Sequence, residues 1–209
     1  MNTLKFTDNK QLISQLNSAS LPADAVSAIA AIAASETTEI AVISALIQAL
    51  SHHHPSVSAA AVKVLVKLAP ATVEPLISAY YNSRDQGLQA YIIQALAQIG
   101  DRTASDLLAE VVGTEVANHC QGNVRRIAAR GLGKIGSTTK DAKTIFGVVQ
   151  KLTWALLTPE DWGLRYAAAV SLQEIATPEA HSALMTAFDR EPDQVVRSRI
   201  ATALEKILL

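Results

Sequence analysis

One apolar pattern recurs five times along the chain and predicts five helices with the same buried face. Its clearest copy is GNVRRIAARGLGKIG, from Gly122 to Gly136, where apolar residues stand at i, i+4, i+8 and i+11. This spacing places them on one face of an α-helix. Four columns align across the copies: Val57, Leu88, Val124, Leu164 and Val196; Ala61, Ile92, Ala128, Ala168 and Ile200; Leu65, Leu96, Leu132, Leu172 and Leu204; and Leu68, Ile99, Ile135, Ile175 and Ile207.

The copies follow one another at the spacing of a helical repeat array. The third column gives intervals of 31, 36, 40 and 32 residues (65 to 96, 96 to 132, 132 to 172, 172 to 204). Units on this scale are typical of an α-solenoid, in which each unit buries its apolar face only by stacking on its neighbours. We therefore predict an all-α solenoid of about five to six helix pairs. It is expected to form a single domain over residues 1–209, with residues 1–36 as an amino-terminal capping unit.

Turn residues separate an outer helix from the inner helix of each pair. Turns are expected at SHHHP, SRDQG, NHCQGN and TPEDWG, and Gly100 is a candidate cap that ends a helix. The inner helix of the GNVRRIAARGLGKIG copy is expected to begin near Val124, directly after NHCQGN. The outer helices are expected over Thr38–Ser51, up to Asn82, up to Val116, over Thr139–Leu157 and over Glu179–Asp189.

Composition and charge exclude several classes of protein. Hydrophobic residues make up 49% of the chain and aromatic residues 4%, so the apolar content consists mostly of Ala, Leu, Ile and Val, which suit close helix packing. A net charge of −1 argues against nucleic acid or an anionic membrane as a bulk electrostatic partner. The single cysteine, Cys120, excludes an internal disulfide framework. No run resembles a signal peptide or a membrane span, so we expect a soluble cytoplasmic protein.

The solenoid explains most residues that suggest a ligand site. Arg125, Arg165 and Arg197 share one column, and the favoured interpretation is that each reaches a neighbouring repeat's aspartate or a helix end. Trp154 and Trp162 are interpreted as packing anchors. The alternative for the tryptophans is an exposed role in stacking on a ligand, because solenoid surfaces do bind through aromatic side chains.

Three consecutive histidines, His52, His53 and His54, are the obvious candidates for a metal site. Metal ligands usually need convergent spacing such as i and i+4, and no cysteine or carboxylate accompanies these residues. We therefore interpret them as a solvated turn and predict no metal site. The sequence also holds no glycine-rich phosphate loop and no Ser/His/Asp arrangement.

The connection NHCQGN is the best candidate for chemistry. Asn118, His119, Cys120, Gln121, Gly122 and Asn123 are polar or reactive residues in an otherwise Ala-rich protein. A helix that begins after them would favour the thiolate of Cys120 through its dipole, and an imidazole exchanges protons near neutral pH. The alternative is an Asn/Gly turn with an inert buried cysteine.

The repeats and the hexapeptide together resemble a known enzyme family. GNVRRIAARGLGKIG and DWGLRYAAAVSLQEI are similar to the HEAT-like repeats of the E/F-type phycobilin lyases, which cover essentially the whole chain. The length resembles the smaller, F-type subunit. NHCQGN resembles the signature of the isomerising branch, which acts on the α subunit of phycoerythrocyanin.

The resemblance implies a specific reaction. An F-type and an E-type subunit form a heterodimer that joins phycocyanobilin to a cysteine of the phycoerythrocyanin α apoprotein and isomerises it to phycoviolobilin. His119 and Cys120 are then the catalytic residues, framed by Asn118, Gln121, Gly122 and Asn123, and Trp162 and Arg165 are candidate substrate-binding residues. No cofactor is implied, because the bilin is a substrate.

Two other classes of function stay open. One is a non-isomerising lyase or bilin chaperone, in which NHCQGN is only a connection. The other is a non-enzymatic interaction solenoid, such as an adaptor for phycobilisomes. The absorbance of the product distinguishes a non-isomerising lyase from a lyase-isomerase. Failure to bind bilin would favour the interaction solenoid.

Overall fold

The computed structural model of the chain is helical throughout the part that it describes. It describes residues 3–113, 119–158 and 161–207, with the side chains of residues 3–8, 119–120 and 206–207 left out. These residues form twelve α-helices and one short 3-10 helix and include no strand, which confirms the predicted all-α class. They fall into two compact units, residues 1–99 and 100–209, and each unit is described by itself. The prediction of one domain over residues 1–209 stays a prediction.

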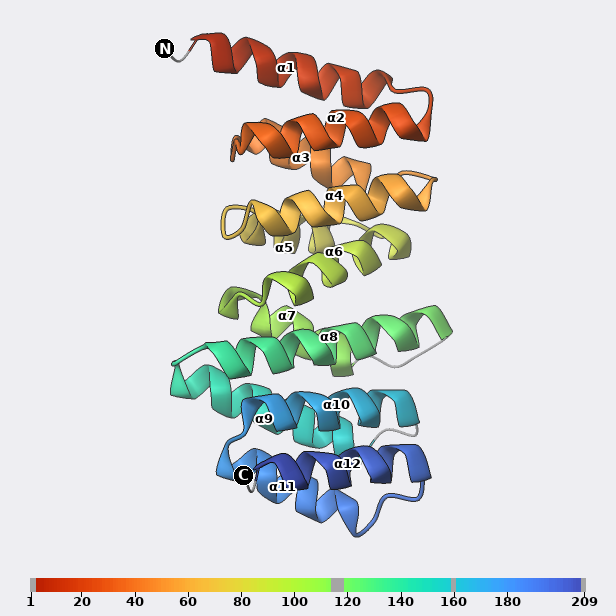
Figure 1. The fold of residues 1–209 in the computed structure, drawn as a ribbon, viewed down its shortest axis with the longest axis vertical. Helices are drawn as coiled ribbons and strands as arrows, with labels where there is room; N and C mark the ends of the chain where they lie inside the picture. The colour runs from red at the N-terminus through yellow and green to blue at the C-terminus, as the bar shows by residue number, and fades with distance from the viewer. Residues whose placement is uncertain (1–2, 114–118, 159–160, 208–209) are drawn as a thin grey trace. The chain divides into compact units, whose positions relative to one another are not determined.

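The first unit is a stack of helices in two rows. It contains α1 (Thr3–Ser18), α2 (Pro22–Ser35), α3 (Ile40–Ala49), α4 (Pro55–Lys67), α5 (Val73–Asn82) and α6 (Gln86–Ile99). In one row α4 packs against both α2 and α6, and in the second row α3 packs on α4 and α5 packs on α6 (Figure 1). Fully buried side chains of the core include Ile32, Leu46, Val57, Leu65, Leu76, Ile92 and Leu96.

The second unit repeats the same two-row arrangement. It contains η1 (Arg102–Ala104), α7 (Ser105–Gly113), α8 (His119–Thr138), α9 (Ala142–Leu157), α10 (Trp162–Ile175), α11 (Pro178–Phe188) and α12 (Gln194–Ile207). Helix α10 lies between α8 and α12 and packs on both, while α9 and α11 form the second row (Figure 1). Its core includes Leu108, Ala128, Leu132, Leu152, Leu164, Leu172, Leu184 and Ile200.

The four apolar columns of the sequence face these cores. The second column, from Ala61 to Ile200, is fully buried in all five copies, and the third is fully buried except for the half-buried Leu204. In the first column Leu88 and Val124 are half-buried. In the fourth column Ile99 is half-buried, and the side chain of Ile207 lies outside the described residues. Burying these stripes between neighbouring helices supplies most of the hydrophobic stabilisation of a repeat array.

Turn chemistry at the helix ends follows the sequence closely. The side chain of His54 accepts a hydrogen bond from Ser56 N and caps α4, which confirms the predicted turn. Gly100 has φ +73, the left-handed conformation expected of a glycine directly after a helix. Asp101 caps η1 by accepting a hydrogen bond from Thr103 N. Among the described residues no helix is long and apolar enough to cross a bilayer.

Candidate functional site

The predicted catalytic residues lie at the beginning of a helix rather than in a connection. Helix α8 begins at His119, so the expectation of a helix starting near Val124 is wrong. His, Cys and Gln tolerate helical conformation, and a glycine inside a helix costs about 1 kcal/mol, which the packing of α8 against α7 and α10 offsets. His119 and Cys120 occupy the first turn of α8. Their side chains and all of Asn118 lie outside the described residues.

The other frame residues of the hexapeptide are described and differ in exposure. Gln121 is half-buried and Asn123 is exposed, with the buried Gly122 between them. Asn123 is therefore open to a ligand, and Gln121 is partly open. Their predicted part in substrate binding stays a prediction.

An ion pair joins the amino-terminal part of α8 to the start of α10. Arg126 Nη2 and Nε lie 2.7 and 3.2 Å from the two carboxylate oxygens of Asp161. Asp161 also caps α10, because one of its oxygens accepts a hydrogen bond from Gly163 N at 2.9 Å. Partial burial by itself raises the pKa of Asp161, but the hydrogen bonds and charge of Arg126 outweigh it and hold this pKa below its ordinary value. The carboxylate is thus ionised and fixed at neutral pH.

Two aromatic side chains stand exposed on α10 beside this ion pair. Trp162 is 50% exposed, so its interpretation as a packing anchor is wrong. Tyr166, one turn further along α10, is also exposed and lies on the same face. The Arg126 guanidinium lies 5.9 Å from the centre of the Trp162 ring. The aromatic faces and the cation form a surface suited to a flat, conjugated, anionic ligand.

Sequence reasoning missed two members of this surface, Tyr166 and Arg126. A usable signal was present, because Tyr166 follows Trp162 at i+4 and an exposed pair at that spacing shares a helix face. Arg126 was not singled out, because it lies outside the repeated arginine column to which its neighbour Arg125 belongs.

The repeated arginine column makes structural contacts. Arg125 Nε donates to Val112 O at 2.9 Å near the carboxyl end of α7, as the structural interpretation expects. Arg165 forms two hydrogen bonds of 2.8 Å with Glu191, a glutamate rather than the expected aspartate. Arg197 instead lies 5.0 Å from the ring centre of Phe188. The Glu191 contact raises the pKa of Arg165. A role for Arg165 in binding substrate stays a prediction.

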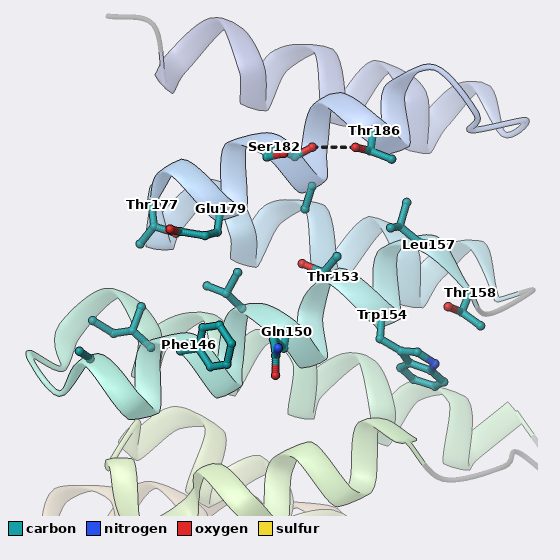
Figure 2. A pocket seen from close by; sticks show the side chains of 14 residues that line it. Phe146, Gln150, Thr153, Trp154, Leu157, Thr158, Thr177, Glu179, Ser182 and Thr186 are labelled. Carbon is teal, nitrogen blue, oxygen red and sulfur yellow. Dashed lines mark hydrogen bonds between the residues drawn. The ribbon is translucent and has the colours of Figure 1, made fainter.

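A groove of about 950 Å³ runs between α9 and α11, on the second row of the same unit. Figure 2 shows Phe146, Gln150 and Trp154 following one another along α9, with Glu179, Ser182 and Thr186 on α11. Trp154 is 37% exposed, so it too is more open than a packing anchor. Lys151 Nζ lies 5.0 Å from the centre of its ring. This α9–α11 groove had no counterpart in the sequence analysis.

The described residues contain no group of three or more His, Cys, Asp or Glu side chains that could hold a metal ion. His52 and His53 stack on each other with ring centres 4.2 Å apart, and His54 is used as a helix cap.

Comparison with known protein families identifies the repeats. The model for HEAT repeats matches residues 43–119, 73–145 and 114–205, which together span most of the chain.

Several curated proteins are similar over nearly their whole length. The chain is 69% identical over 205 residues to the bilin biosynthesis protein PecF of Mastigocladus laminosus, covering 97% of both chains. It is 68% identical over 162 residues to the PecF protein of Nostoc sp. PCC 7120, covering 78% of this chain and 94% of that protein. A phycocyanobilin lyase subunit beta from Thermosynechococcus vestitus is 31% identical over 85% of this chain and 86% of its own length.

A solved structure shares the fold. A chain in the complex of CpcE and CpcF of phycocyanin lyase from Nostoc sp. PCC 7120 is similar with a TM-score of 0.68 and 28% identity. The similarity covers 79% of this chain and 99% of that one.

Proposed function

Because the chain belongs to the E/F-type phycobilin lyase family of HEAT-repeat proteins, we propose that it is the F-type subunit of a cytoplasmic, two-chain bilin lyase-isomerase. In this role it joins phycocyanobilin to a cysteine of the phycoerythrocyanin α apoprotein and yields bound phycoviolobilin. The observation that carries the proposal is the identity of 69% to a PecF protein over 97% of both chains.

The reaction has two parts that make different demands on the protein. Attachment forms a thioether between the acceptor's cysteine sulfur and the ethylidene group of ring A. Isomerisation moves a double bond from Δ4 to Δ2 by two allylic shifts: C3 loses a proton as C5 gains one, and C2 then loses a proton as C4 gains one. The second part is proton transfer without net oxidation, so a positioned acid–base group is sufficient.

His119 and Cys120 are the residues that we assign to the proton transfer. An imidazole exchanges protons near neutral pH, and a thiolate can add transiently to a conjugated system and leave again. Both residues occupy the first turn of α8, where the helix dipole favours negative charge. The assignment rests on the NHCQGN motif.

The surface formed by Trp162, Tyr166 and Arg126 suits the bilin. A linear tetrapyrrole is flat and conjugated, so its rings can stack on Trp162 and Tyr166. Its propionates are anionic, and the Arg126 side chain remains 39% exposed while it pairs with Asp161. Arg126 follows Cys120 by six residues on α8, about 9 Å along the helix axis. A bilin on this surface therefore lies within reach of the first turn of α8.

The test is reconstitution from separate components: this chain, an E-type subunit, phycocyanobilin and the phycoerythrocyanin α apoprotein. We expect a covalent product that absorbs to the blue of bound phycocyanobilin, because phycoviolobilin has the shorter conjugation. Bound phycocyanobilin as the only product would make the chain a non-isomerising lyase subunit. If no covalent product forms and no bilin binds, the chain is a non-enzymatic interaction protein.

A further inference from the structure

Helix α9 carries a second apolar stripe that its own unit leaves uncovered. One face of α9 is buried through Val148, Val149, Leu152, Ala155 and Leu156. Another face presents Phe146, Gln150, Trp154 and Leu157, at i, i+4, i+8 and i+11. Phe146, Trp154 and Leu157 are 59%, 37% and 42% exposed. We call these four residues the α9 stripe. Three large apolar side chains in one line on a surface helix usually mark a binding surface.

The α9 stripe forms one side of the α9–α11 groove. The opposite side is α11, which contributes Glu179, Ser182 and Thr186 (Figure 2). The groove residues on α9 run from Ala142 to Leu157, about 22 Å of helix. A groove of this length, with one apolar side and one hydroxyl-bearing side, can accommodate another helix.

The charge of the groove argues against a second bilin site. Glu179 is the one ionisable side chain among the described residues that line it, and it is acidic. A bilin carries two anionic propionates, which would meet the like charge of Glu179, while the nearby cation Lys151 lies over the Trp154 ring and is not among the lining residues. A segment with a lysine or arginine opposite Glu179 fits the groove better.

We propose that the α9–α11 groove seats an amphipathic helix of the E-type partner subunit. Apolar residues of that helix, at helical spacing, contact Phe146, Trp154 and Leu157, and one basic residue pairs with Glu179. The proposal rests on the proposed function, since it takes its partner from there.

The apolar character of the α9 stripe indicates the E-type subunit rather than the acceptor apoprotein. Permanent subunit interfaces are more apolar than transient ones, because their surface is never returned to water. The acceptor must leave after each turnover, and an exposed Phe, Trp and Leu would then meet solvent repeatedly. The E-type subunit stays bound and keeps the α9 stripe covered.

The first experiment measures binding of the purified E-type subunit by calorimetry and gel filtration. Phe146→Asp combined with Trp154→Asp should weaken the complex at least 100-fold, because two carboxylates would be buried against apolar surface. Val195→Asp is the matched control: Val195 is 56% exposed, lies on α12 away from the groove and should leave binding unchanged. Circular dichroism should show equal helix content in all variants, since only exposed side chains change.

The second experiment tests the role of the Glu179 charge and changes the surface at a single position. Glu179→Lys should weaken binding of the E-type subunit about 10-fold or more, and Glu179→Gln should weaken it less. Replacing Phe146 by the photo-crosslinker p-benzoylphenylalanine should yield a covalent product with the E-type subunit on irradiation. This measurement does not depend on the stability of a disruptive variant.

The binding and crosslinking results distinguish the possible occupants of the α9–α11 groove. Undiminished binding of the E-type subunit by the double aspartate variant, or crosslinking to the acceptor apoprotein instead, overturns the proposal. Crosslinking to a second copy of this chain overturns it as well. If the unmodified subunits bind each other through the groove but yield no bilin product, the proposed function fails and the docking surface stands.

Discussion

Gly133 on α8 lies directly against Ser171 on α10. A β-carbon at Gly133 would fall 2.5 Å from the Ser171 side chain and 2.9 Å from its Cα, so backbone as well as side chain would have to move. The Ser171 hydroxyl donates to Ala129 O and accepts from Arg130, both at 3.0 Å, which fixes it in this contact. The two helices can approach this closely only because the position has no side chain.

Gly133→Ala should therefore destabilise the protein by about 2–3 kcal/mol through overpacking. The melting temperature should fall by roughly 5–10 °C, since 1 kcal/mol corresponds to about 2–4 °C in a chain of this size. Gly147→Ala is the matched control: a β-carbon there meets nothing within 4 Å. It should stabilise α9 by about 0.5–1 kcal/mol, because alanine is the better helix former. Equal effects of the two substitutions would contradict the close contact.

Removing Glu191 should cost about 3 kcal/mol or more, measured by urea denaturation. The side chains of Glu191 and Arg165 are 2% and 12% exposed, so Glu191→Ala leaves a buried guanidinium without its counter-charge. Arg165→Met combined with Glu191→Leu should recover most of the loss, because no charge then stays buried. Additive losses in the double variant would contradict this account.

The same pair sets an expectation for alkaline pH. The pKa of Arg165 is raised above its ordinary value, chiefly by its hydrogen bonds to Glu191, so its contribution is complete at neutral pH and is lost only as the pH rises through the higher folded value. The stability difference between the native protein and Glu191→Ala should therefore stay constant from about pH 7 to pH 9.

Asp161 predicts a dependence on acid pH. Its pKa is lowered in the folded protein, so its contribution is present above the ordinary value of 3.8 and is lost as the pH falls through the folded value. Asp161→Asn should lower stability at pH 7, and the difference from the native protein should shrink towards pH 3. A difference for Asp161→Asn that is independent of pH would point to lost capping geometry rather than lost charge.

His119→Ala combined with Cys120→Ser should divert the product from phycoviolobilin to bound phycocyanobilin. Attachment should suffer less, because it uses the acceptor's own cysteine. The melting temperature should change little, since Ala and Ser are both tolerated in the first turn of a helix. Ser137→Ala, exposed at the other end of α8, is the control for both readouts. Phycoviolobilin formed at an undiminished rate would remove these residues from the mechanism.

Trp162→Ala should weaken bilin binding about 3–10-fold in an absorbance titration of the assembled complex, the range expected for loss of one stacking partner. Trp162→Phe should restore most of the affinity, because it keeps an aromatic face. Since the ring is half exposed, the melting temperature should stay within about 2 °C of the native value. An unchanged titration for the alanine variant would place the bilin elsewhere.

The fold was predictable from sequence because its signal is repeated. Each copy places the same four apolar columns on one helix face, and the fully buried second column, from Ala61 to Ile200, confirms that reading. The start of α8 was not predictable from local chemistry. Gly122 and Asn123 favour a turn by propensity, but the packing of α8 against α7 and α10 outweighs this local preference, and the helix begins at His119.

The exposed aromatics were not predictable for a different reason. The apolar periodicity does not assign Trp154 and Trp162 to the buried or the exposed face of their helices. Their exposure depends on how α9, α10 and α11 pack. The α9 stripe has the same i, i+4, i+8, i+11 spacing as the buried columns. Sequence alone therefore cannot separate a stripe that meets its own unit from one that stays open for another protein.

The ion pairs of the second unit differ in their sensitivity to ionic strength, because some are partly exposed and one is buried. Arg126–Asp161 and Arg130–Glu174 join α8 to α10 at partly exposed positions, where 1 M salt, with a screening length of about 3 Å, weakens their attraction. Arg165–Glu191 joins α10 to the segment before α12 away from solvent and is screened far less. Concentrated salt should therefore leave the α8–α10 contact to its buried apolar side chains and the close fit of Gly133 against Ser171, and amide hydrogen exchange should begin to rise on α8 before it rises on α12.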